Sequence, residues 1–392
     1  MITSFGESLR KLRLERGLRQ KDLAGPGLSR SLISMYESGR LLPSYEILQS
    51  LATRLGVSVE VFFGGASEPV QRALLHIVNG ACNAENIGDF ETACELWDTA
   101  RTLAATYHIE GWALQTKFRY ALSLTECARW DEAVRALFDL LVDRDVHEMG
   151  MMYEILRSLG KAHRYLGQPK HAIIAFQHAR NLVSPSDVRW VRMGINVASE
   201  LALSGQWESA LAEFEECIAA ARTMGEGILE GWALIGWTTA QLDQGIVQGC
   251  EEKLARAEEL ARILQYEQLS VAAAHNRAVF YRLTEQWGRM EGCLKYALAR
   301  TEDPFSLGQL LAEELEWATQ NQNWNQVDEI IRKGEELPIQ GPVRARLWLS
   351  AARSFRLQGD IAKAESLFAK AQEILRESRS FTLPGYQLPA KS

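Results

Sequence analysis

The 392-residue chain has no long apolar run, an absence that bears on where the protein works. No stretch of about 18 residues is uniformly apolar, so no transmembrane helix and no membrane partner are expected. The residues after Met1 lack the charged-then-apolar order of a secretory signal peptide. With neither signal in the sequence, we expect a cytoplasmic protein.

Cysteine and proline are scarce. The six cysteines are scattered without a CxxC pair, which predicts reduced side chains inside helices, not a disulfide framework or a zinc site. Ten prolines, with no Ser/Gly/Pro-rich tract, leave most of the chain able to order. The sequence also lacks a metal-binding histidine spacing, a Walker A loop, a nucleophile elbow and a dinucleotide fingerprint. We therefore expect no enzyme activity, no cofactor and no metal.

Charge is divided unevenly along the chain. Residues 1–65 hold nine Lys/Arg and six Asp/Glu, a net charge of +3, whereas the whole chain carries −7. A basic N-terminal part on an acidic remainder is the asymmetry expected when only the first part meets a polyanion.

Residues 1–65 show the apolar spacing and glycine stops of five short helices. Phe5, Leu9 and Leu12 lie on one helical face, and Gly17 ends that segment. The predicted helices cover about 5–16, 20–24, 29–38, 45–55 and 57–63. Gly25-Pro26-Gly27 forces a tight turn between the second and third, which is a helix-turn-helix arrangement.

This segment resembles the Xre / lambda-repressor-like family. The resemblance rests on LRQKDLA at 18–24, LSRSLISMYESGR at 28–40, Pro43-Ser44 and LATRLGV at 51–57. It implies that the third helix enters the major groove and that its first residues reach base edges. The residues expected at DNA are Gln20, Lys21, Ser29, Arg30, Ser31, Ser34 and Arg40. Within this set, Arg30 is expected to read guanine, while Gln20, Lys21 and Arg40 hold phosphates. Glu37 is expected to pair with Arg10.

A different pattern recurs beyond residue 69. A turn residue, an aromatic or apolar anchor, and a small apolar residue three positions later repeat at a spacing of 37–40 residues. The eight anchors are Phe90, Trp130, Pro169, Trp207, Val247, Trp287, Trp324 and Ile361. A fixed period near 40 with helical patterning predicts a solenoid of helix hairpins. It resembles tetratricopeptide (TPR) repeats. The expected fold is therefore all-α: a five-helix helix-turn-helix domain followed by a right-handed solenoid of about eight helix-hairpin, TPR-like repeats.

The domain boundaries follow from these patterns. We expect a DNA-binding domain at 1–65, a linker at 66–69, a repeat domain for effector binding and dimerisation at 70–378, and an extended C-terminal tail at 379–392.

The first helix of each repeat is expected to line the concave face of the solenoid. Asparagine recurs at three of seven positions that the alignment on the anchors makes equivalent, and its amide can both donate to and accept from a peptide backbone. The seven are Asn79, Arg119, Ser158, Asn196, Gly236, Asn276 and Glu313. Cations nearby would suit a carboxylate. The residues expected to bind peptide are Asn79, Arg119, Arg157, Lys161, Arg164, Arg192, Asn196, Trp232, His275 and Asn276.

The order of the two parts resembles the RRNPP class of peptide-sensing, quorum-sensing regulators of Gram-positive bacteria. That resemblance implies a homodimer on a double-stranded DNA operator, with a short signalling peptide in the repeats that changes DNA affinity or head spacing. Other effectors stay open: the repeats can instead bind a protein partner as a scaffold, a small molecule, or no effector at all.

Overall fold

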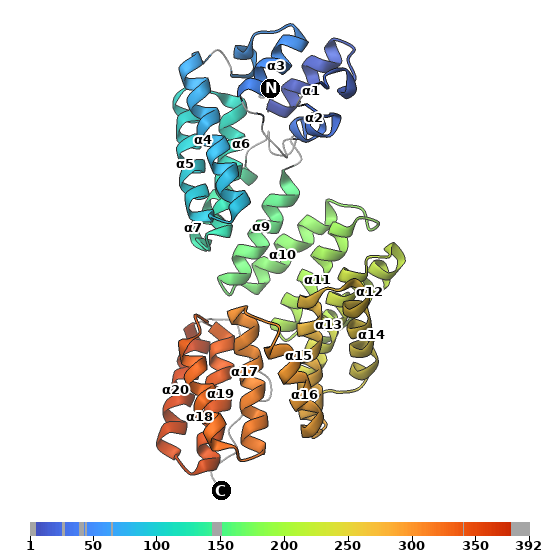
Figure 1. The fold of residues 1–392 in the computed structure, drawn as a ribbon, viewed down its shortest axis with the longest axis vertical. Helices are drawn as coiled ribbons and strands as arrows, with labels where there is room; N and C mark the ends of the chain where they lie inside the picture. Colours follow the sequence, from blue (N-terminus) through green and yellow to red (C-terminus); the bar gives the residue numbers. More distant parts are fainter. Residues whose placement is uncertain are drawn as a thin grey trace. The chain divides into compact units, whose positions relative to one another are not determined.

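A computed structural model describes residues 5–25, 28–38, 43, 45–63, 66–142, 151–339 and 341–377. Within these ranges the chain forms helices and no strand (Figure 1). None of the described helices is both long enough and apolar enough to cross a membrane. The expected all-α class is confirmed. The tail predicted at 379–392 lies outside the described residues.

The N-terminal domain has the five expected helices. They are α1 (Phe5–Glu15), the 3-10 helix η1 (Gln20–Asp22), α2 (Arg30–Glu37), α3 (Tyr45–Leu55) and the 3-10 helix η2 (Val59–Phe63). Gly17 and Gly56 follow α1 and α3 with φ of +65° and +62°, a conformation that glycine adopts without steric strain. The predicted helix boundaries are therefore accurate to within a few residues.

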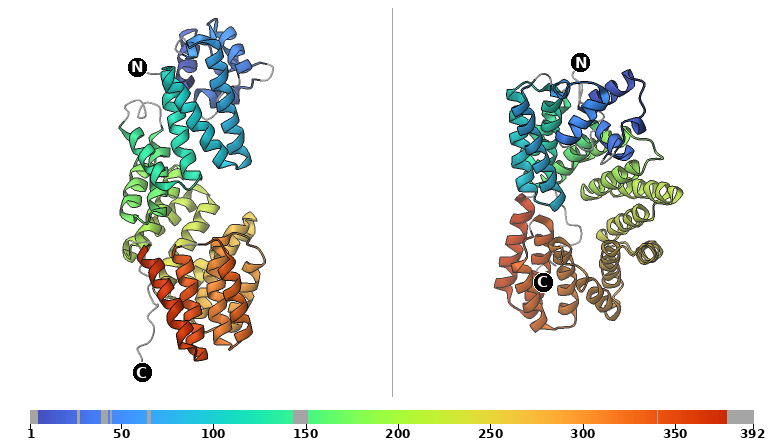
Figure 2. Two further views of the ribbon diagram at one scale, coloured as in Figure 1. Left: turned by 90° about the vertical axis from the view of Figure 1, so that its left-hand side faces the viewer. Right: turned by 45° about the horizontal axis from the view of Figure 1, so that its top comes forward.

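In the part of the chain that the structure describes, eight pairs of helices follow in chain order. They are α4 (Glu68–Ile87) with α5 (Phe90–Thr106), α6 (Glu110–Glu126) with α7 (Trp130–Leu141), α9 (Met152–Tyr165) with α10 (Pro169–Asn181), α11 (Val188–Leu203) with α12 (Trp207–Met224), α13 (Gly227–Asp243) with α14 (Cys250–Leu264), α15 (Glu267–Leu283) with α16 (Trp287–Leu298), α17 (Pro304–Gln320) with α18 (Trp324–Glu336), and α19 (Gly341–Gln358) with α20 (Ile361–Glu377). Both views in Figure 2 show the orange and red helices after residue 304 side by side.

The anchor residues mark the starts of the second helices. Seven of the eight anchors are the first residue of their helix, and the exception is Val247, because α14 begins at Cys250. Gly249 has φ of +75°, a left-handed conformation that ends the turn and cannot lie inside an α-helix. Small side chains three residues after an anchor, such as Ala93 and Ala210, are fully buried, which explains why the repeat requires them.

The chain divides into two compact units, Met1–Ala162 and His163–Ser392. In the first unit, one apolar core runs from Phe5 and Leu9 of α1 through Leu74 of α4 to Trp97 and Trp112. The N-terminal domain is therefore packed on the first helix pairs, not hung from a free linker. The second unit has separate cores in successive pairs.

Candidate nucleic-acid interface and inner helix faces

The first turn of α2 presents polar side chains to solvent. Ser29 caps the helix by accepting a hydrogen bond from the backbone nitrogen of Leu32, 3.2 Å away. Arg30, Ser31 and Ser34 follow, and all four predicted contact residues of this helix are exposed. The opposite side of α2 is buried through Ile33 and Tyr36, at 0% and 2% exposure. The helix therefore has one face fixed in the core and one face free to meet a ligand.

Glu37 at the end of α2 joins three elements. Its carboxylate accepts hydrogen bonds from Arg13 Nε at 2.5 Å, Arg13 Nη2 at 2.9 Å and Gln20 Nε2 at 3.0 Å. Burial alone would raise the pKa of Glu37, but the bonds from Arg13 and Gln20 outweigh it and lower that pKa. The prediction that Arg10 pairs with Glu37 is therefore wrong, because Arg13 forms this ion pair.

The predicted phosphate contacts are placed unequally. Lys21 is exposed, whereas Gln20 is half-buried and its amide nitrogen is used by Glu37. Arg40 lies outside the described residues.

In the first unit, the predicted peptide contacts pair with neighbouring helices or within their own. Arg119 of α6 lies 3.7 Å from Glu85 of α4, and Lys161 of α9 donates to Glu126 of α6 at 3.0 Å. Arg157 donates to Glu154 on its own helix at 2.6 Å. Asn79 of α4 is half-buried.

In the second unit, the same type of tie joins α9 and α11. Arg164 Nη2 donates to Asn196 Oδ1 at 3.0 Å, and Arg164 Nε donates to the buried carboxylate of Glu200. Burial raises the pKa of Glu200 against the effect of Arg164. Arg192, one turn before Asn196, is exposed.

The remaining predicted contacts lie on α13 and α15. Asn276 of α15 is 3% exposed, and its amide nitrogen donates to Ile235 O, Thr238 Oγ1 and Thr239 Oγ1 of α13 at 2.9–3.1 Å. Burial lowers the pKa of His275 to about 4, so this side chain is uncharged at neutral pH, where the sequence predicts a cation. Trp232 is half-buried, with its ring edge-on to Tyr266 at 6.5 Å.

A buried ionic cluster around Glu313 was not predicted. Glu313 of α17 is fully buried and accepts hydrogen bonds from Arg282 of α15 at 2.7 Å and from Arg346 of α19 at 2.5 Å. Beside it, Glu316 accepts from Arg353 at 2.5 Å. The polar pairs described above each join the first helix of one pair to the first helix of the next, and we call them the inter-repeat ladder. Its members are Glu85–Arg119, Glu126–Lys161, Arg164–Glu200, Thr238–Asn276, Arg282–Glu313, Glu313–Arg346 and Glu316–Arg353. The anchor alignment did mark position 313, and the unexpected acid there was the available signal.

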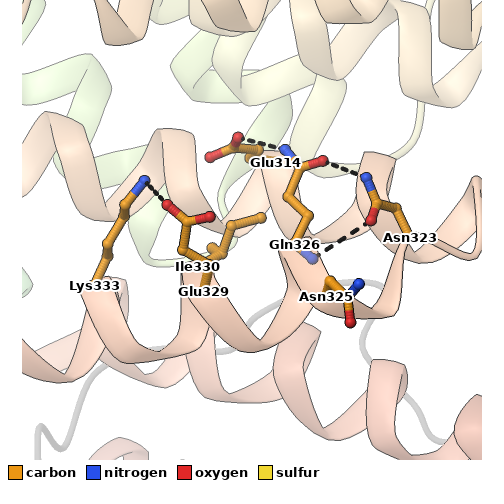
Figure 3. A pocket seen from close by; sticks show the side chains of 7 residues that line it. All are labelled: Glu314, Asn323, Asn325, Gln326, Glu329, Ile330 and Lys333. Atoms are coloured by element: carbon orange, nitrogen blue, oxygen red, sulfur yellow. Dashed lines mark hydrogen bonds and ion pairs between the residues drawn. The ribbon is translucent and has the colours of Figure 1, made fainter.

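One hollow of about 380 Å³ lies on α17 and α18 (Figure 3). Its polar side chains bind one another: Gln326 donates to Glu314 at 2.9 Å, Asn323 donates to Gln326 at 2.8 Å, and Lys333 pairs with Glu329 at 2.8 Å. Because these groups satisfy one another, the hollow is a poor candidate for a ligand site.

Comparison with known proteins identifies the N-terminal domain. Residues 9–62 match the Helix-turn-helix family. The HTH-type transcriptional regulator DdrOP3 of Deinococcus deserti is 50% identical over 60 residues, which are 15% of this chain. The match spans only 46% of the length of that curated relative. The predicted helix-turn-helix family is thus confirmed for this domain.

Two solved structures of Rap proteins resemble most of the chain. RapI without ligand superimposes with a TM-score of 0.62 at 10% identity, covering 96% of this chain and 98% of that one. A Rap protein complexed with Competence and Sporulation Factor gives 0.57 at 11% identity, covering 94% and 99%. PlcR of Bacillus thuringiensis in complex with the peptide PapR7 and DNA gives 0.37 at 17% identity, covering 70% and 98%. The Rap similarities confirm the helical fold.

Proposed function

Residues 9–62 form a helix-turn-helix domain, and from this we propose that the chain is a sequence-specific DNA-binding transcription regulator of the cytoplasm. The observation that carries the proposal is the two-sided character of α2. Its inner side is fixed by Ile33 and Tyr36, while Ser29, Arg30, Ser31 and Ser34 project from its first turns. A helix held in this way can enter the major groove with its N-terminal side chains toward base edges.

Arg30, Lys21, Arg40 and Gln20 have different roles in this proposal. Arg30 donates a pair of hydrogen bonds to guanine O6 and N7, a contact worth about 1–3 kcal/mol of discrimination. Lys21 and Arg40 hold phosphates and set the register without reading sequence. Gln20 contributes mainly by holding Glu37, because its amide nitrogen is already engaged there.

Selection from a random duplex library tests this function. The full chain should enrich a common sequence, and its affinity for that sequence should fall as salt rises, because phosphate contacts release counterions. Enrichment of no sequence, or binding that salt does not weaken, would reject the proposal.

We propose further that the helix pairs bind a short peptide that alters DNA binding by a homodimer. Support comes from the shared fold with a Rap protein solved with Competence and Sporulation Factor, and from polar side chains on the first helices, such as Arg192 and Asn196 of α11. The contacts proposed in the first unit are Asn79, Arg119, Arg157 and Lys161. Those proposed in the second unit are Arg164, Arg192, Asn196, Trp232 and His275, of which Arg192 is exposed. Asn276 acts chiefly by supporting α13, since its amide nitrogen is occupied.

Thermal shift with peptide fractions from the culture medium tests the effector, and light scattering tests the dimer. A stabilising fraction should also change affinity for the selected DNA. Loss of that effect in Arg192→Ala would support the proposed site. No stabilisation by any fraction, with a protein co-purifying instead, would favour the scaffold alternative.

A further inference from the structure

The turn between η1 and α2 is held by a side chain from a distant helix. Carbonyl groups at the end of a helix have no donor within that helix. At the end of η1, the carbonyls of Leu23 and Ala24 both accept hydrogen bonds from Arg54 Nη1 of α3, the first at 2.9 Å. Arg54 lies about thirty residues further along the chain, so this contact ties α3 to the turn.

Gly25 shows how closely the guanidinium lies against the turn. A Cβ atom at position 25 would lie 2.1 Å from Arg54 Nη2 and 2.5 Å from Nη1, far inside any permitted contact. The absence of a side chain at Gly25 is therefore what admits Arg54. No pattern in the sequence indicated this relationship.

The braced turn leads directly into the proposed reading helix. Gly25 and Leu28 exchange two backbone hydrogen bonds of 2.9 Å, and Leu23 and Leu28 on either side are buried at 0% and 3% exposure. Ser29, the cap of α2, follows Leu28 immediately. Whatever fixes this turn also fixes the start of α2 and hence the place of Arg30.

We infer that Arg54 is a positioning residue for DNA recognition: its guanidinium braces the turn that aims α2. The inference rests on the proposed function of α2. It assigns Arg54 Nη1 to the carbonyls of Leu23 and Ala24 and not to bases or phosphates, although the residue as a whole is exposed. A basic residue near a DNA surface is otherwise read as a phosphate contact, and the two roles have different consequences.

The experiment compares Arg54→Met, Arg54→Lys and the charge-loss control Arg135→Met, whose arginine is exposed on α7. Each full-length variant is titrated with the duplex selected by the wild-type chain and with an unrelated duplex, over a range of salt. Arg54→Met should weaken binding to the selected duplex by about fivefold or more, the scale of one misplaced bidentate base contact. Binding to the unrelated duplex and the slope of log affinity against log salt should stay unchanged. Arg135→Met should change neither.

A phosphate contact gives the opposite pattern. Arg54→Met would then weaken both duplexes in parallel, reduce the slope by about 0.9, and be rescued by Arg54→Lys. That result, or equal binding by Arg54→Met and wild type, would overturn the inference while leaving the proposed function intact. Failure of the wild type to select any duplex would overturn both.

Two further measurements keep the test independent of DNA. Deuterium exchange of peptides covering residues 23–33 should rise in Arg54→Met without DNA, and thermal unfolding of the full chain should show that the fold persists. Gly25→Ala should reproduce the binding defect by displacing the guanidinium, and the double variant should be no worse than either single one. Additive defects, or unchanged exchange, would contradict the brace.

Discussion

The indole nitrogen of Trp112 donates a hydrogen bond to the carbonyl oxygen of Phe62, 3.1 Å away. Trp112 belongs to α6 and Phe62 to the last helix of the N-terminal domain, so the bond joins the helix-turn-helix domain to the second helix pair. Trp112 also stacks on Phe63 at 5.5 Å and lies 5.9 Å from Phe5. The helix-turn-helix domain and the first helix pairs therefore share one packed core.

Trp112→Phe should weaken the packing of the helix-turn-helix domain on the first helix pairs. The substitution removes the donor and leaves the buried carbonyl of Phe62 unpaired, a loss of about 1–3 kcal/mol in the free energy of unfolding. Deuterium exchange in residues 5–15 should increase. Trp317→Phe is a matched control, because Trp317 donates a similar 3.1 Å bond to Trp287 O in the second unit. Exchange in residues 5–15 that rises equally in both variants would contradict the assignment.

Substitution of Arg13 should lower the stability of the first unit, because it leaves the buried Glu37 carboxylate without its ionic partner. The two side chains are 9% and 5% exposed, and losing one partner of a buried pair costs about 3–5 kcal/mol. Arg13→Met should therefore lower the unfolding temperature of the first unit, and Arg13→Met with Glu37→Met should recover most of it. Arg10→Met should have no such effect. Calorimetry checks this, and no recovery in the double variant would show that packing, not charge, dominates.

Acid should weaken the second unit through Glu313. Burial alone would raise the pKa of this carboxyl, but Arg282 and Arg346 lower it to about 2 from an ordinary value of 4.5. A lowered pKa contributes stability that is complete above 4.5 and is lost as the pH falls toward 2. Glu313→Gln should destabilise by about 3–5 kcal/mol at pH 7.

The pH profile distinguishes this origin from a general packing defect. In urea unfolding, the difference between wild type and Glu313→Gln should be constant above pH 5 and shrink below pH 4.5. Glu329→Gln, which breaks an exposed pair with Lys333, should leave the midpoint unchanged. A Glu313→Gln difference that does not shrink in acid would contradict the ionic account.

The positions of the helices were predictable because local sequence patterns determine them. Glycine stops and apolar spacing located the five short helices, and the period near 40 located the second helices at residues such as Trp207 and Trp287. The prediction that a helix begins at Val247 was wrong, because Gly249 has a left-handed conformation and the helix begins only after it. Such a displacement depends on backbone geometry that the repeat does not encode.

The candidate sites were less predictable because their state depends on neighbours distant in sequence. Anchor alignment placed Asn276 correctly on a first helix, but not its burial against Thr238 of the preceding pair. Likewise the family pattern predicted that Arg30 meets DNA, but it assigned no role to Arg54. The carbonyl groups that accept hydrogen bonds from Arg54 lie about thirty residues away in the sequence. Spacing shows which residues share a face; only the packed chain shows whether that face is already occupied.

The most direct test of the account is guanine N7 methylation of the selected duplex, with and without protein. Dimethyl sulfate reacts with N7 in the major groove, where Arg30 is proposed to donate its hydrogen bonds. The account predicts that the wild-type chain protects at least one guanine and that Arg30→Ala, with an unchanged unfolding temperature, leaves it reactive. Guanines that stay reactive under bound wild-type protein, or stay protected under Arg30→Ala, would contradict it.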